Sequence, residues 1–230
     1  MKSTTPLSVI TQSARTGLSG SWGKAIGIML VYMVLMMGVT QVPFAGGLLQ
    51  WIFAPPLVVG MHMFFLATVR SQYNPFSLLF DGFGRFGTSW CAYVLVQLIV
   101  MAWMIPFMLL AAGLFFFVHP DGALMPAYTV YALMAIVLLT MVAVIILIQM
   151  RYYQVLYIVA DDPSVRAREA IRRSIELMSG NYWRLGLLWL RFIGWQILCI
   201  FTLGIGFIWL IPYMTAATAA FYDDLTVNGN

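Results

Sequence analysis

Long apolar stretches alternate with short polar segments along the chain. Four of these stretches contain no acidic or basic residue: 25–69, 86–120, 122–150 and 192–222. A helix needs about 20 apolar residues to cross the hydrocarbon core of a bilayer. Because lipid offers no hydrogen-bond partners, the backbone of each stretch must bond to itself. The pattern therefore predicts an all-α membrane protein.

The first and the last stretch are each too long for one span. Both contain a turn-forming segment, at 42–47 and at 202–206, with glycines and, in the first, a proline. The chain is therefore expected to form a single polytopic domain, 1–230, with six spans. These spans are about 24–41, 48–69, 88–117, 127–150, 183–202 and 206–222. A five-span arrangement, in which the last stretch is one long tilted helix, is the alternative.

The segment 163–179 is predicted to form an amphipathic helix at the membrane surface. Asp162 can cap it, and Pro163 suits the first helical position. At helical spacing one face is mostly apolar and the other carries arginines and glutamates, some of them spaced for i,i+4 ion pairs. The basic face suits the headgroup layer or the ends of the spans.

Weaker amphipathic segments near 6–19 and 76–83 precede the first and third spans. The chain thus suggests three units, each a surface helix followed by a membrane hairpin. Ser19-Gly20 before Trp22 resembles Ser179-Gly180 before Trp183, although the middle unit matches poorly.

The charges change this picture in two ways. Only 9% of the 230 residues are charged and 62% are hydrophobic, which excludes a soluble globular domain, a disordered chain and, despite a net charge of +4, a nucleic-acid binder. With six spans, every lysine and arginine falls on one side. The opposite connections, 42–47, 118–126 and 202–206, carry only Asp121. This positive-inside pattern predicts that both termini are cytoplasmic.

The basic side is the surface predicted to bind lipids or partner proteins. Its candidate contacts to anionic lipid headgroups, or to a membrane-protein partner or second copy of the chain, are Arg166, Arg168, Arg172, Arg173, Arg184 and Arg191. Arg191 lies about two turns inside the fifth span, where it either extends toward the interface or forms an anion site with Arg184.

Other polar residues within the spans give no catalytic or metal-binding pattern. His62, Cys91 and Cys199 are far apart in sequence, and three glutamines, Gln97, Gln149 and Gln196, suit hydrogen bonds between helices. No nucleotide, hydrolase or protease motif is present. We therefore expect no catalytic residue, metal or cofactor.

Several segments resemble one bacterial family. Tyr157–Pro163, Phe192-Ile193-Gly194-Trp195 and Trp209–Tyr213, with Trp22-Gly23-Lys24-Ala25 near the start, are similar to the integral-membrane family catalogued as domain of unknown function 975. Arg191 departs from the pattern, which has a small polar residue there. The resemblance implies a multi-pass protein of the bacterial inner membrane and supplies no activity.

Together these observations favour a non-enzymatic membrane protein that acts through lipid or protein contacts at its basic face. A small transporter or permease component is the alternative, because Pro55-Pro56, Pro106 and Pro212 interrupt spans as they do in transporters.

Overall fold

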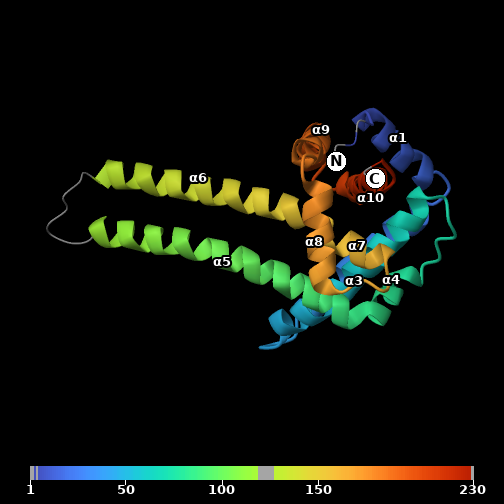
Figure 1. Ribbon diagram of the computed structural model, residues 1–230, viewed down its shortest axis with the longest axis horizontal. Helices are drawn as coiled ribbons and strands as arrows, with labels where there is room; N and C mark the ends of the chain where they lie inside the picture. The colour runs from blue at the N-terminus through green and yellow to red at the C-terminus, as the bar shows by residue number, and fades with distance from the viewer. Residues whose placement is uncertain (1–2, 4, 119–126, 229–230) are drawn as a thin grey trace.

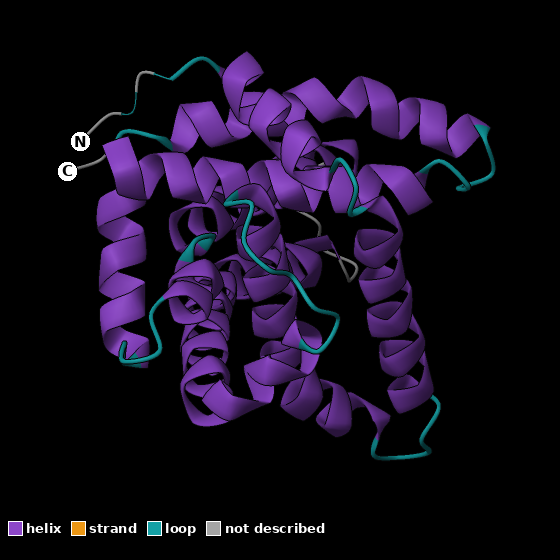
Figure 2. Cartoon of the chain, turned by 90° about the vertical axis from the view of Figure 1, so that its right-hand side faces the viewer, coloured by secondary structure: helices purple, strands orange, loops and turns teal. Residues whose placement is uncertain are grey.

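The computed structural model describes residue 3, residues 5–118 and residues 127–228, and this part of the chain contains helices and no strand (Figures 1 and 2). The helices are α1 (Leu7–Leu18), α2 (Trp22–Thr40), α3 (Gly46–Val69), α4 (Leu78–Asp81), the 3-10 helix η1 (Gly82–Arg85), α5 (Phe86–Val118), α6 (Ala127–Tyr152), α7 (Val155–Asp161), α8 (Ala167–Met178), α9 (Tyr182–Phe201) and α10 (Phe207–Asn228). The all-helical prediction is confirmed for these residues.

Five helical segments are long and apolar enough to cross a membrane: Trp22–Thr40, Gly46–Val69, Leu78–Leu114, Tyr128–Asp161 and Tyr182–Phe201. They correspond to the first five predicted spans. The sixth predicted span forms α10, which is long enough but less apolar, because it carries Pro212, several threonines and Asp223-Asp224. The predicted connection at 118–126 lies, from residue 119 onward, outside the described residues.

The helix α3 is at the centre of the fold. It contacts α2, α4, α5, α7, α10 and α1, and half of its most apolar window is buried. Phe64 and Phe65 are fully buried and pack edge to face within the largest apolar core. Burial on several sides explains why α3 is apolar all round and has no polar stripe.

The hairpin α5–α6 extends away from the other helices (Figure 1). Its side chains remain largely uncovered by protein; Leu109 and Leu139, for example, are 68% and 69% exposed. Exposed apolar surface on this scale is stable only in lipid or against another protein. In the same view α9 and α10 are strongly foreshortened, so the α9–α10 hairpin is not parallel to α5–α6.

The first and last units share a local structure. α1 and α8 each have 12 residues, and each is followed by a serine in extended conformation, a glycine at positive φ and a polar residue just before the next helix. Gly20 and Gly180 have φ of 84° and 83°, a left-handed conformation that glycine adopts without a steric penalty. The buried positions also correspond: Ile10, Ala14 and Leu18 in α1, and Ala170, Ser174 and Met178 in α8.

The three units also pack in a cyclic order. α4 and η1 pack on α3, the last helix of the first unit, and α8 packs on α6, the last helix of the second. α1 packs on α10, the last helix of the third unit, which closes the ring. The middle unit departs from the other two because α4 and η1 replace the 12-residue surface helix.

A close backbone contact joins α3 to the start of the second unit. A Cβ atom at Gly60 would overlap the carbonyl oxygen of Leu79, and one at Gly82 would overlap the carbonyl oxygen of Pro56. Only glycine at both positions lets the two backbones come this close.

The start of the surface helix differs from the prediction. α8 begins at Ala167, four residues after Pro163, and Arg166 before it is extended. The Asp162 carboxylate accepts hydrogen bonds from the Ser164 amide, at 2.9 Å, and from the Ser164 hydroxyl, at 2.6 Å. Asp162 therefore stabilises a turn before the helix instead of capping the helix itself.

Candidate functional site

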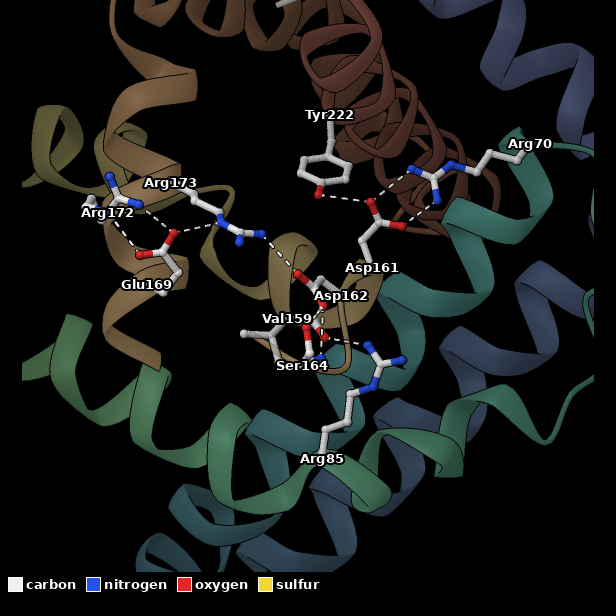
Figure 3. Close-up of polar contacts among 10 residues, drawn as sticks. All are labelled: Arg70, Arg85, Val159, Asp161, Asp162, Ser164, Glu169, Arg172, Arg173 and Tyr222. Carbon is white, nitrogen blue, oxygen red and sulfur yellow. Dashed lines mark hydrogen bonds and ion pairs between the residues drawn. The ribbon is translucent and has the colours of Figure 1, made fainter. Parts of the chain in front are cut away.

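A charge cluster joins three helices at the end of α7 (Figure 3). The guanidinium of Arg70, which ends α3, donates two hydrogen bonds to Asp161, at 2.5 and 3.1 Å, and one to Asp223 of α10, at 2.7 Å. The Tyr222 hydroxyl donates to the same Asp161 carboxylate at 3.2 Å. About a quarter of each side chain in the Arg70–Asp161 pair is exposed, so the pair is partly shielded from solvent. Its position between α3, α7 and α10 indicates a structural role.

Arg85 also binds the end of α7. Its Nη1 donates to the carbonyl oxygen of Val159 at 2.6 Å (Figure 3) and to that of Ala160 at the same distance. The last carbonyls of a helix have no partner within the helix, so a cation placed there satisfies them and complements the helix dipole.

Two of the predicted contact arginines, Arg172 and Arg173, are ion-paired on the surface of α8. Both bind Glu169; Arg172 also binds Glu176, and Arg173 reaches Asp162 at 3.0 Å. The hydrogen bond from Arg172, followed by that from Arg173, lowers the pKa of Glu169 to about 2, so this carboxylate is charged throughout the physiological range. The acidic partners offset the two cations, and this face of α8 is less basic than its arginines suggest.

Arg184, another predicted contact residue, lies mostly inside the protein. Its side chain is 17% exposed, and its Nη2 lies 3.6 Å from Asp224 of α10 and 2.5 Å from the Thr5 carbonyl oxygen. The hydroxyls of Ser3 and Thr5 donate to the same aspartate. Arg184 therefore connects the N-terminal segment to α9 and α10.

Arg166 and Arg168, by contrast, are exposed and form no ion pair with any described residue. They remain predicted lipid or partner contacts.

Arg191 lies in a polar groove between α1 and the last hairpin. The groove has a volume of about 600 Å³ and is lined by Ser8, Thr11, Gln12, Arg15, Thr16, Ser19, Arg191 and Tyr213. Among the residues that the structure describes, neither Arg15 nor Arg191 has an ion-pair partner, and no carboxylate lines the groove. The Tyr213 hydroxyl donates to the Thr11 carbonyl oxygen at 3.3 Å and so connects α10 to the floor of the groove.

This groove, which we call the arginine groove, can bind an anion. An anion in the groove would offset the like charges of the two guanidinium groups that line it, and each group can donate a bidentate pair of hydrogen bonds to a phosphate. The hydroxyls of Ser8 and Thr16 and the Gln12 amide supply further neutral donors. The hydroxyls of Thr11, Ser19 and Tyr213 already donate to carbonyl oxygens.

From the sequence, Arg191 was expected either to extend toward the interface or to form an anion site with Arg184, one heptad earlier on the same helix. Instead, the groove combines Arg191 with Arg15, which sequence reasoning missed as a site residue. The available signal was weak: Arg15 lies on the polar side of α1, in its last turn, and only the packing of α1 on α10 brings it to α9.

The structure does not gather the other polar residues singled out within the spans into a metal site. Cys91 is exposed and Cys199 is buried, both as free thiols, and the described residues contain no group of three potential metal ligands. The Gln196 amide contacts the Met214 sulfur at 3.5 Å, as expected of a side chain that links two helices.

Comparison with known protein families gives a match over nearly the whole chain. Residues 2–229 match the family described as protein of unknown function DUF975. The chain belongs to this family. DUF975 membership confirms the resemblance drawn from the terminal motifs and extends it through the middle of the chain. No curated protein and no solved structure matches the chain.

Proposed function

We propose that the protein is a non-enzymatic membrane protein that binds anionic phospholipids through the arginine groove. The observation that carries this proposal is the meeting of Arg15 and Arg191 in one polar groove without a carboxylate. Arg70, Arg172, Arg173 and Arg184, in contrast, are ion-paired to carboxylates of the chain itself.

The surroundings of Arg191 favour a lipid over a free anion. Leu190, Ile193 and Trp195 flank Arg191 on α9 and are between 44% and 61% exposed. Apolar side chains beside an arginine suit the acyl chains of a lipid, which a free anion lacks. A phospholipid would thus place its phosphate in the arginine groove and its chains along α9.

The test is to replace both arginines by glutamine and to count bound lipids by native mass spectrometry in mild detergent. Arg15→Gln with Arg191→Gln is expected to weaken phosphatidylglycerol binding at least tenfold, a change of about 1.4 kcal/mol or more in binding free energy, because both charge-assisted donors are lost. Phosphatidylcholine, which is zwitterionic, should bind weakly and change little.

The matched control is Arg172→Gln with Arg173→Gln. It removes the same number of positive charges from another surface helix, α8, where each is offset by an acidic residue. We expect this control to bind phosphatidylglycerol as the unaltered protein does. If both double variants lost binding equally, net charge rather than the arginine groove would control binding.

We further propose six spans with both termini in the cytoplasm of a bacterial cell and the protein in its inner membrane. The one-sided distribution of lysine and arginine supports this topology, and so does the hairpin formed by α9 and α10 around the 202–206 turn.

A reporter that is active only outside the cytoplasm tests this topology when it is inserted in the 202–206 turn. We expect it to be active there and inactive when it is inserted between α7 and α8, at 163–165. An inactive reporter at 202–206 would instead indicate that the α9–α10 hairpin lies on the cytoplasmic surface. Such a position would agree with the direction of this hairpin, which is not parallel to α5–α6 (Figure 1).

A further inference from the structure

The two cations of the arginine groove come from different helices. Arg15 lies in the last turn of α1, whereas Arg191 lies near the middle of α9, and both side chains are exposed. Both helices pack on α10, which contributes Tyr213 to the lining of the groove (Figure 1). Because the two guanidinium groups extend from separate helices into one groove, each can bind an anionic group of its own.

The neutral donors of the groove lie beside one of the two arginines. Ser8, Gln12 and Thr16 line the groove from α1, at spacings of four residues that place them on one face of this helix. Among the residues that the structure describes, α9 contributes only Arg191 to the lining. An anionic group at Arg15 therefore also meets hydroxyl and amide donors, whereas one at Arg191 is bound by the guanidinium alone.

The charge and the size of the groove both exceed what one phosphodiester requires. The two guanidinium groups carry two positive charges, and within the described part of the chain no carboxylate lines the groove to offset them. A phosphodiester carries one negative charge, so a single phosphatidylglycerol offsets only half of this positive charge. The groove volume of about 600 Å³ is also much larger than one phosphate group. A headgroup with two phosphates matches both the charge and the size.

We propose that the arginine groove binds cardiolipin, the lipid in which one glycerol joins two phosphates. This inference rests on the proposed function, because it names the phospholipid that the same groove prefers. One phosphate binds Arg15 and the neutral donors of α1, and the other binds Arg191. Once the first phosphate is bound, the glycerol holds the second one near its own arginine, which raises its effective concentration there. Basic pockets between membrane helices are known to bind the cardiolipin headgroup.

The test compares lipids on the unaltered chain by native mass spectrometry in mild detergent. Cardiolipin is expected to bind about tenfold more tightly, or better, than phosphatidylglycerol at the same phosphate concentration, because its second phosphate binds intramolecularly. Monolysocardiolipin, which keeps both phosphates but lacks one acyl chain, should bind as cardiolipin does. Phosphatidic acid, which has a single phosphate monoester, should bind less tightly than cardiolipin.

Single substitutions test the assignment of one phosphate to each arginine. Arg15→Gln alone, or Arg191→Gln alone, is expected to remove the preference for cardiolipin over phosphatidylglycerol, because only one phosphate then has a cationic partner. Arg172→Gln is the matched control. It removes one positive charge from α8, where acidic neighbours offset that charge, and should keep the full preference. Each variant is first checked for an unaltered elution volume and melting temperature; if one fails, the lipid comparison on the unaltered chain decides the outcome.

The possible outcomes separate this inference from the proposed function. If cardiolipin and phosphatidylglycerol bound equally tightly, and both were lost when Arg15 and Arg191 were replaced together, the proposed function would stand and the cardiolipin inference would be overturned. Equal binding of phosphatidic acid and cardiolipin would also overturn it, because charge rather than a second phosphate would then decide. So would monolysocardiolipin that binds no better than phosphatidylglycerol, or a cardiolipin preference that survives both single substitutions. Binding of neither cardiolipin nor phosphatidylglycerol would overturn the proposed function as well.

Discussion

Replacing Gly60 by alanine is expected to destabilise the protein by about 3 kcal/mol, the upper end of the usual cost of overpacking. The added methyl group would meet the Leu79 carbonyl, a backbone atom that cannot move aside as a flexible side chain can. Gly82→Ala should behave alike, because its methyl group would meet the backbone of Pro56 from the other side. Thermal unfolding in detergent measures both effects.

Gly84→Ala is the control for this prediction. Gly84 lies in the same short 3-10 helix as Gly82, but a methyl group there would meet no atom within 4 Å. We expect Gly84→Ala to unfold at the temperature of the unaltered protein. A similar loss of stability in all three variants would mean that the segment tolerates no side chain at any of these positions. The close contact between α3 and α4 would then not be the cause of the destabilisation.

Replacing Arg70 by alanine is also expected to lower the free energy of unfolding by about 3 kcal/mol. Removing one partner of a shielded ion pair leaves the other charge without compensation, and here both Asp161 and Asp223 would lose their cation. Arg70→Lys should recover only part of the stability, because an ammonium group cannot reproduce the bidentate contact to Asp161.

Unfolding of both Arg70 variants can be followed in detergent beside Arg172→Ala. Arg172 also contacts two carboxylates, but its side chain is 64% exposed, and exposed ion pairs add little to stability. We expect almost no change for Arg172→Ala. If Arg172→Ala lost as much stability as Arg70→Ala, shielding from solvent would not explain why the Arg70 ion pair stabilises the protein.

Much of the fold could be predicted from the sequence because lipid imposes a simple rule on the backbone. Uncharged stretches must be helical, so the bounds of α2, α3, α5 and α9 were predicted to within two residues. The surface helix α1 followed from its spacing of apolar residues. The start of α8 was wrong by four residues, because the Asp162 side chain was assigned to the helix when it binds Ser164 in the preceding turn.

The sites were less predictable, because helical spacing shows which residues share a face but not which helices meet. Arg15 and Arg191 are far apart in sequence, and only the contact between α1 and α10 brings them together. For the same reason the sequence did not show that His62 and Gln149, on α3 and α6, line one cavity. Likewise, a count of arginines could not distinguish those already paired, such as Arg173, from those left unpaired.

The packing of α1 on α10 has a consequence for biosynthesis. The ribosome makes α1 well before its partner α10, because the other helices lie between them in the chain. Until then, of the two neighbours α3 and α10, only α3 can cover α1, and the rest of its apolar face must be protected by the membrane surface or by a chaperone. The native contacts between α1 and α10 can therefore form only after every helix between them has been synthesised.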